Sequence, residues 1–150
     1  MTQLVAHGLA VTLPTGWEGR ILRRTPVDAQ DSPRTVVHCA TFPLPEQRDD
    51  FGGGVTNLMR SSDVFVVVFE YGPESVGQPL FASQGVPRLD ASAFSGRRLQ
   101  RPLPGQLGCQ RFFTVDGRAF CLYVVAGSRA SLAGIVSKVN QLLAELVVQP

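Results

Sequence analysis

The feature that most constrains this chain is a run of six apolar residues, Val64–Phe69, which lies between Asp63 and Glu70. A short, continuous run of β-branched and aromatic residues is typical of a strand that is covered on both faces. Charged residues such as these two often flank an apolar strand, where they reduce its tendency to aggregate. A strand of this kind needs apolar side chains above and below it, so the run predicts a central strand in a globular domain.

A helical pattern near the C-terminus predicts one of the covering layers. Apolar residues recur there at helical spacing, while Lys138, Gln141 and Glu145 fall outside the stripe. The stripe consists of Leu132, Ile135, Val136, Val139, Leu142, Leu143 and Leu146. It predicts an amphipathic helix that reaches Leu146, with Ser128 or Ser131 as its N-cap. We expect this helix to lie on the sheet that contains the central strand.

Other segments predict the remainder of the sheet. Leu9–Leu13 has the pattern of a strand, Trp17–Arg24 that of its hairpin partner, and Thr35–Phe42 that of a third strand. Val55–Met59 is compatible with either a helical turn or a short strand. Asp90 is placed to cap a short helix that follows it.

Asp116-Gly117 is a strong signal for a two-residue hairpin turn. It predicts that Cys109–Val115 pairs with Arg118–Ala126. In the resulting register Cys121 faces Phe112, and Cys109 faces Val124. The hairpin is the most closely specified element in the sequence.

The hairpin register also bears on the cysteines. It places Cys109 and Cys121 on opposite faces of the sheet, where they cannot form a disulfide; a bulged turn would instead bring them to one face as diagonal neighbours. Cys39 makes the number of cysteines odd, and the three show no disulfide spacing. We therefore expect three buried, reduced thiols.

Composition excludes several classes of protein. Hydrophobic residues make up 44% of the chain and charged residues 17%, which fits one globular domain spanning residues 1–150. The net charge of +2 is too small to indicate nucleic-acid binding. No apolar segment is long enough to span a membrane, and the N-terminus does not have the pattern of a signal peptide. The sequence therefore predicts a soluble cytoplasmic protein without nucleic acid or membrane insertion.

Catalytic and metal-binding patterns are absent from the sequence. His38 and Cys39 are neighbours in a predicted strand, so their side chains point to opposite faces rather than forming a reactive pair. The histidines and cysteines lack the spacing of a zinc site, and Glu46, Asp49 and Asp50 lack that of a calcium loop. Gly52–Gly54 is not followed by the Lys and Ser/Thr of a phosphate-binding loop. We predict no metal, no cofactor and no enzymatic activity.

The arginines are the remaining candidates for function. The chain has thirteen arginines but one lysine, a bias that a GC-rich genome explains. The densest cluster is Arg97, Arg98 and Arg101, with Arg88 upstream and the long Pro/Gly-rich segment Gly72–Leu89 before it. We predict that these four arginines contact a protein partner at one sheet edge. The alternatives are a small-molecule carrier or unrecognised enzyme with a pocket between helix and sheet, and a structural subunit of a larger assembly.

The two ends of the chain resemble a known fold group. The segment Gly8–Trp17, which ends in Leu13-Pro14-Thr15-Gly16-Trp17, resembles the start of domains in the PsbP/Mog1-like group. The strand Phe120–Val125 leading into a terminal helix is also similar. The resemblance implies an α/β/α sandwich around an antiparallel sheet. It also implies a role like those of the group's mostly non-enzymatic members, which are accessory subunits of photosynthetic complexes, a small-GTPase binding factor and bacterial lipoproteins. It transfers no functional residue, because the matching motifs are structural.

Overall fold

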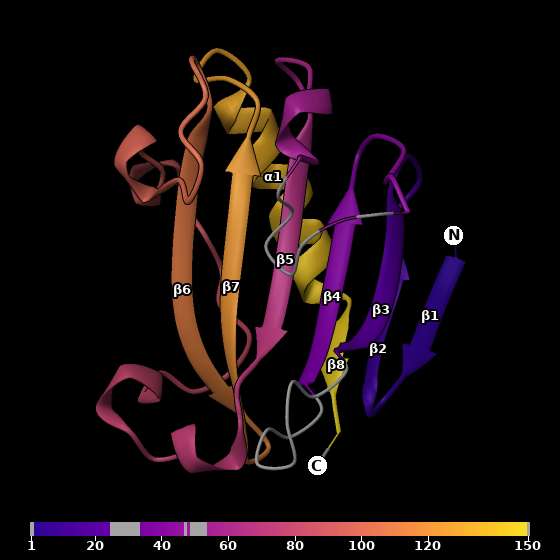
Figure 1. The fold of residues 1–150 in the computed structure, drawn as a ribbon, viewed down its shortest axis with the longest axis vertical. Helices are drawn as coiled ribbons and strands as arrows, with labels where there is room; N and C mark the ends of the chain where they lie inside the picture. Colours follow the sequence, from indigo (N-terminus) through magenta and orange to yellow (C-terminus); the bar gives the residue numbers. More distant parts are fainter. Residues whose placement is uncertain (1, 25–33, 47, 49–53, 150) are drawn as a thin grey trace.

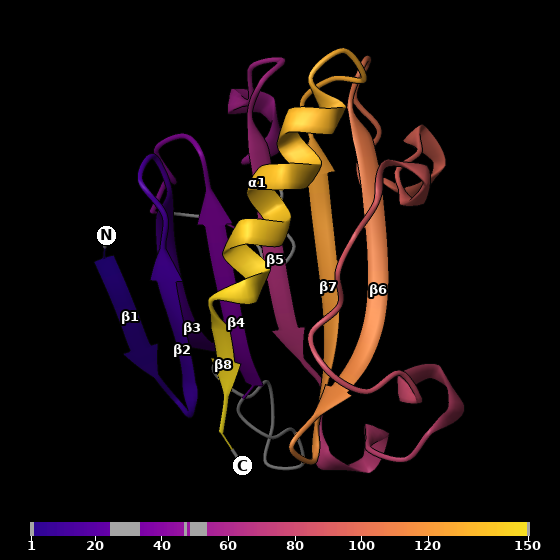
Figure 2. The same ribbon diagram turned by 180° about the vertical axis from the view of Figure 1, so that it is seen from behind.

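The computed structural model describes residues 2–24, 34–46, 48 and 54–149 of the chain. In these residues the strands form two antiparallel sheets, and the α-helix α1 (Leu132–Ala144) crosses the larger one (Figures 1 and 2). The predicted α+β class, with a C-terminal amphipathic helix packed on an antiparallel sheet, is confirmed.

The larger sheet has the strand order β3-β4-β5-β7-β6. Its strands are β3 (Glu18–Arg24), β4 (Arg34–Ala40), β5 (Val64–Glu70), β6 (Leu107–Val115) and β7 (Arg118–Ala126). The predicted central strand is β5, whose six apolar residues are each at most 5% exposed. It has that position because both of its faces are apolar, and only an interior strand has both faces covered.

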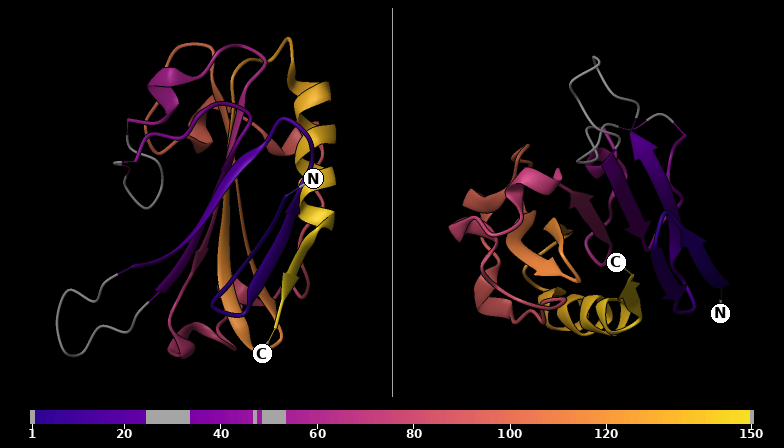
Figure 3. Two further views of the ribbon diagram at one scale, coloured as in Figure 1. Left: turned by 90° about the vertical axis from the view of Figure 1, so that its right-hand side faces the viewer. Right: turned by 90° about the horizontal axis from the view of Figure 1, so that it is seen from below.

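One face of β5 packs against α1. Val64, Val66 and Val68 belong to the main core cluster, to which α1 contributes Leu132, Ile135, Val139, Leu142 and Leu143. These are the alternate residues of the strand and the 3.6-residue stripe of the helix, as the sequence predicts. The helix and the smaller sheet lie on the same side of the larger sheet (Figure 3).

The other face of β5 is covered by loops in the described residues. Phe65, Val67 and Phe69 form a second core cluster with residues such as Phe42 and Leu99, which lie outside the strands and α1. The described part of this face carries no α-helix. The second helical layer of an α/β/α sandwich is therefore not confirmed, and the coarser α+β class is what the structure establishes.

The smaller sheet corrects the predicted pairing of the N-terminal segments. It consists of β1 (Thr2–Ala6), β2 (Leu9–Leu13) and β8 (Leu146–Val148), in the order β1-β2-β8. The predicted hairpin between Leu9–Leu13 and Trp17–Arg24 is wrong, because β2 pairs with β1 and β8 while β3 pairs with β4. A turn between β2 and β3 leads the chain from one sheet to the other. In this turn the Trp17 N–H donates to the Pro14 carbonyl at 3.2 Å, and Gly16 adopts a positive φ of 92°.

The C-terminal boundary of the helix is also corrected. The helix ends at Ala144, and Leu146, which we predicted as its last apolar residue, begins β8. The side chain of Leu146 is still buried in the main core, so the apolar pattern continues while the backbone changes from helix to strand. At the other end Ser131 is the N-cap residue, and its N–H donates to the hydroxyl of Ser128 at 3.2 Å.

The β6–β7 hairpin has the predicted register. Asp116 and Gly117 both have positive φ, 49° and 74°, as a type I′ turn requires. Cys109 pairs with Val124 and Cys121 with Phe112. All three cysteines are free and buried, as predicted. Burial raises the pKa of the Cys39 thiol to about 12 and that of Cys121 to about 11.

The connecting segments contain short 3-10 turns. Thr56–Leu58 forms one of them, which decides between the two alternatives for Val55–Met59 in favour of a helical turn. Asp90 caps another of these turns, Ala91–Ala93, by accepting a hydrogen bond from the Ser92 N–H at 3.0 Å. A further turn, Gly96–Arg98, leads to the outer edge of β6.

Candidate functional site

The segment 95–100, here called the edge segment, is fixed to the outer edge of β6. Ser95 and Gly108 exchange two backbone hydrogen bonds of 2.9 and 2.8 Å, and the Gln100 N–H donates to the Tyr123 hydroxyl at 2.8 Å. A Cβ atom at Gly108 would lie only 2.7 Å from the Arg98 carbonyl oxygen, so glycine permits this close approach. Leu99 adds a buried side chain to the second core cluster. The edge segment is therefore held both at the strand edge and on the sheet face that carries the second core cluster.

This anchored segment presents arginines to solvent. Arg97 and Arg98 lie on the 3-10 turn, Arg101 follows the segment, and all three are exposed. No carboxylate of the described residues forms an ion pair with any of them. Arg97 and Arg98 thus combine a fixed backbone with guanidinium groups that form no ion pair in the described residues, which suits bidentate contacts to carboxylates. These two residues and Arg101 are here called the arginine cluster.

Arg88 lies apart from the arginine cluster. It is exposed on the α1 side of the molecule, where it borders a hollow of about 240 Å³ together with Asn140 and Leu143. The chain reaches this position because Asn140 binds the backbone of Leu89 through both of its side-chain atoms, at 2.8 Å each. Arg97, Arg98 and Arg101 thus lie on or directly after the edge segment, whereas Arg88 lies beside α1.

The middle of the β6 edge is a feature that the sequence analysis missed. The two-residue turn makes Val115 and Arg118 a hydrogen-bonded pair, so every second residue of β6, counted from Val115, forms backbone hydrogen bonds with β7. The backbone N–H and C=O groups of the residues between them point outward, away from β7. Of the outward-pointing residues, Gly108 bonds to Ser95, and Thr114 bonds to Ser83 and Gly85. Those between them are Gln110 and Phe112. The hairpin register alone could have shown this alternation, but not that β6 is an edge strand.

Arg111 lies between these two outward-pointing residues and is exposed. Its guanidinium donates a long hydrogen bond, 3.5 Å, to the Gln110 carbonyl. The charges of Arg111 and Arg98 both lower the pKa of the Cys109 thiol, although its burial outweighs them and the pKa is raised. Arg111 also lowers the pKa of Asp90, after the hydrogen bonds from Ser92.

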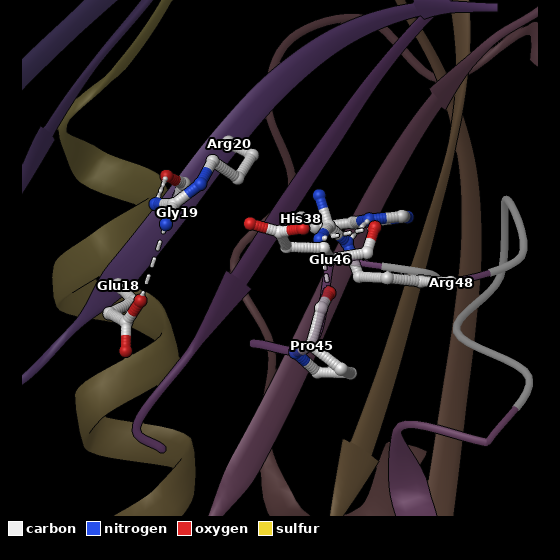
Figure 4. A network of polar contacts seen from close by, with 7 residues as sticks. All are labelled: Glu18, Gly19, Arg20, His38, Pro45, Glu46 and Arg48. Carbon is white, nitrogen blue, oxygen red and sulfur yellow. Dashed lines mark hydrogen bonds and ion pairs between the residues drawn. The ribbon is translucent and has the colours of Figure 1, made fainter. Parts of the chain in front are cut away.

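His38, the one buried histidine, has a structural role in the described residues (Figure 4). Its Nδ1 accepts a hydrogen bond of 2.9 Å from the Nε of Arg48, and Arg48 also donates to the Pro45 carbonyl. An Nδ1 that accepts from a guanidinium carries no proton and is already occupied. Burial, and then the charge of Arg20, lower the pKa of Arg48. The network ties the chain after β4 back to that strand.

The predicted separation of His38 from Cys39 agrees with the packing. His38 contacts the ring of Phe65 on the face of the second core cluster, at a centroid distance of 5.5 Å. Cys39 belongs to the main core on the α1 side. The described residues contain no group of three His, Cys, Asp or Glu side chains able to hold a metal ion. Asp49, Asp50, Gly52 and Gly53, which we considered for calcium and phosphate, lie outside those residues.

The space between helix and sheet is filled. A hollow of about 10 Å³ remains between Val66 and Leu142, which is no more than a water-sized gap. Larger openings lie at the surface. One of about 430 Å³ is bordered by Trp17, Lys138 and Asp63. Asp63 is occupied there, since its oxygens accept from the Thr41 hydroxyl at 3.0 Å and from the Arg60 N–H at 2.9 Å.

No helix among the described residues is both long and apolar enough to cross a membrane. No protein-family model matches the chain, and comparisons with the curated proteins and with the solved structures found no match either. The geometry of the β6 edge is therefore the observation that bears on function.

Proposed function

We propose that this chain is a non-catalytic binding domain that engages an acidic protein partner through the arginine cluster on the β6 edge. The observation that carries the proposal is the contrast between backbone and side chains there. The edge segment is fixed by Ser95, Leu99 and Gln100, yet its guanidinium groups are exposed and make no ion pair with the described residues. Binding residues are commonly found on loops that a rigid scaffold positions.

The chemistry of the partner follows from the side chains. Arginine binds carboxylates through two parallel hydrogen bonds, and its charge steers an acidic partner towards the site. A protein partner is favoured over nucleic acid because the net charge of the whole chain is only +2. The three free thiols support a reducing compartment such as the cytoplasm.

The other functions raised by the sequence have less support. A small-molecule carrier with a pocket between helix and sheet needs several hundred cubic ångströms, whereas this space holds about 10 Å³. A role as a structural subunit would also need a binding surface. The β6 edge provides one for either an assembly or a transient complex.

The test compares two charge-reversed proteins of equal net charge. The site variant carries Arg97→Glu, Arg98→Glu and Arg101→Glu. The control carries Arg23→Glu, Arg60→Glu and Arg129→Glu, three exposed arginines that were not predicted to contact the partner. Both are used with the wild type in affinity capture from the native cell, with quantitative mass spectrometry. We expect acidic proteins captured by the wild type and the control to be depleted at least tenfold with the site variant. Equal recovery with both variants would refute the proposal.

A further inference from the structure

The unpaired middle of the β6 edge suggests how a partner binds there. In the described residues no hydrogen bond is found for the N–H groups of Gln110 and Phe112 or for the carbonyl of Phe112. The Gln110 carbonyl has only the long contact from Arg111, 3.5 Å. Figures 1 and 2 show no ribbon beside the outer edge of β6 along this stretch. The strand therefore presents two N–H and two C=O groups in the geometry of a sheet edge.

At both ends of this stretch the outward-pointing backbone groups of β6 are already hydrogen-bonded to other segments. Ser95 pairs with Gly108 at one end, and Ser83 and Gly85 bond to Thr114 at the other. Between these points the chain leaves the edge and packs against α1, where Asn140 holds Leu89. The opening therefore spans residues 109–113 and accepts a short extended segment rather than a long strand. Its two closed ends fix where such a segment can bind.

The side chains beside the opening define the chemistry of the segment. Arg111 is exposed on the face that also carries Cys109, whereas Gln110 and Phe112 are half-buried and point to the other face. Phe112 is part of an aromatic group with Tyr71 and Phe81, at centroid distances of 6.3 and 5.5 Å. Directly opposed residues of paired strands contact one another, so an acidic residue suits the position facing Arg111 and apolar residues suit its neighbours.

We propose that the β6 edge binds an extended peptide segment of alternating acidic and apolar residues by strand addition between the edge segment and Thr114. The inference rests on the proposed function and specifies its partner. The backbones of Gln110 and Phe112 provide up to four hydrogen bonds, and Arg111, Arg97 and Arg98 provide the positive charge. Asp90 is the carboxylate near Arg111, and it is held by Ser92 rather than paired with Arg111.

A single backbone position offers a direct test. The Gln110 N–H points away from β7, so Gln110→Pro removes an outward donor and leaves the β6–β7 hydrogen bonds in place. Gln110→Ala is the matched control, because it removes the same side chain and its contact with the Cys121 sulfur but keeps the N–H. The probe is a fluorescein-labelled peptide, Gly-Glu-Val-Glu-Val-Glu-Gly, measured by anisotropy at low salt. We expect Gln110→Pro to weaken binding about tenfold or more, and Gln110→Ala to weaken it less than about threefold.

Methylation of the peptide tests the same inference without changing the protein. In an antiparallel complex the valines face Gln110 and Phe112, so their amides point at β6 and those of the glutamates point to solvent. N-methylation of the valine amides should therefore abolish binding, whereas N-methylation of a glutamate amide should not. In the wild-type complex, amide exchange at Gln110 and Phe112 should slow. Equal binding by both methylated peptides, unchanged exchange, or no binding at about millimolar peptide would each overturn strand addition.

The outcomes also separate this inference from the proposed function. Partner capture that depends on Arg97, Arg98 and Arg101 but is unchanged by Gln110→Pro would leave the proposed function standing and refute strand addition. If Gln110→Pro weakens peptide binding while charge reversal of the arginine cluster leaves partner capture unchanged, strand addition is supported and the proposed arginine site is refuted.

Discussion

Arg118 on β7 and Glu70 on β5 form a two-pronged ion pair, with Nε 2.8 Å from one carboxylate oxygen and Nη2 2.9 Å from the other. These hydrogen bonds raise the pKa of Arg118. The same guanidinium donates to the carbonyls of His7, at 3.1 Å, and Gln149, at 3.0 Å. His7 lies in the turn before β2, and Gln149 follows β8. One side chain therefore joins the larger sheet to two parts of the smaller sheet.

Replacing Arg118 should be costly for stability. Arg118→Ala leaves Glu70, whose side chain is 17% exposed, without its partner, and it leaves two backbone carbonyls without this donor. We expect the free energy of unfolding in urea to fall by about 2–4 kcal/mol. Arg98→Ala is the control, since that exposed arginine has no ion pair in the described residues, and it should change stability by less than about 0.5 kcal/mol. Equal effects of the two substitutions would show that the ion pair does not stabilise the fold.

The buried thiols predict a loss of stability in alkali. The pKa of Cys39 is raised to about 12 and that of Cys121 to about 11, from 9.0, mainly by burial. The folded state thus keeps these protons when the unfolded state has lost them, so the stabilisation is complete below pH 9 and is lost as the pH rises towards 11–12. Each thiol should contribute a slope approaching about 1.4 kcal/mol per pH unit. Urea unfolding at several pH values measures it.

The double variant Cys39→Ala, Cys121→Ala is the control for this pH dependence. It should unfold with a smaller loss of stability between pH 9 and pH 10, where tyrosines contribute less than they do at higher pH. A thiol reagent gives an independent measurement. The three cysteines of the folded protein should react far more slowly than those of the unfolded chain. Rapid reaction of all three at neutral pH would contradict their burial.

Asn140 on α1 should control the opening of the segment around Leu89. Its side chain accepts from the Leu89 N–H and donates to the Leu89 carbonyl, both at 2.8 Å. Asn140→Ala removes both bonds, and we expect a local loss of about 1–2 kcal/mol. Hydrogen exchange of the Leu89 amide should then accelerate about tenfold, while amides of β5 should change less. Gln141→Ala, at an exposed position of the same helix, should leave exchange at Leu89 unchanged.

Local patterns in the sequence predict those parts of the fold that local interactions determine. The position of β5 follows from six apolar residues, and the β6–β7 register follows from Asp116 and Gly117, because a two-residue turn fixes which residues face each other. The main body of α1 follows from its stripe. Arg97 and Arg98 are exposed, and their contact with a protein partner stays a prediction.

Sheet membership and the binding edge could not be predicted in the same way. Leu146 continues the helical spacing of Leu143, yet it belongs to β8, because pairing with β2 determines the backbone there. β1 has two exposed residues at its start and little apolar alternation, so it lacks the usual strand signal. Which strands form an edge depends on contacts distant in sequence. For that reason the sequence could not show that Gln110 and Phe112 lie on an open sheet edge. It also could not show that Arg88 lies beside α1 instead of with the other three arginines.

Two glycines provide a matched test of how the connection between β7 and α1 packs against residues 60–61. A Cβ atom at Gly127 would lie 2.1 Å from the Arg60 carbonyl oxygen and 2.8 Å from that of Ser61, whereas one at Gly134 would have no neighbour within 4 Å. Gly127 cannot shift freely, because its N–H donates to the Asp63 carbonyl at 2.9 Å. Gly127→Ala should therefore destabilise the fold by about 2–3 kcal/mol. Gly134→Ala lies within α1 and should stabilise it by up to about 1 kcal/mol, because alanine loses less backbone entropy in a helix. Thermal and urea unfolding measure both, and effects of the same sign would contradict this placement of Gly127 against residues 60–61.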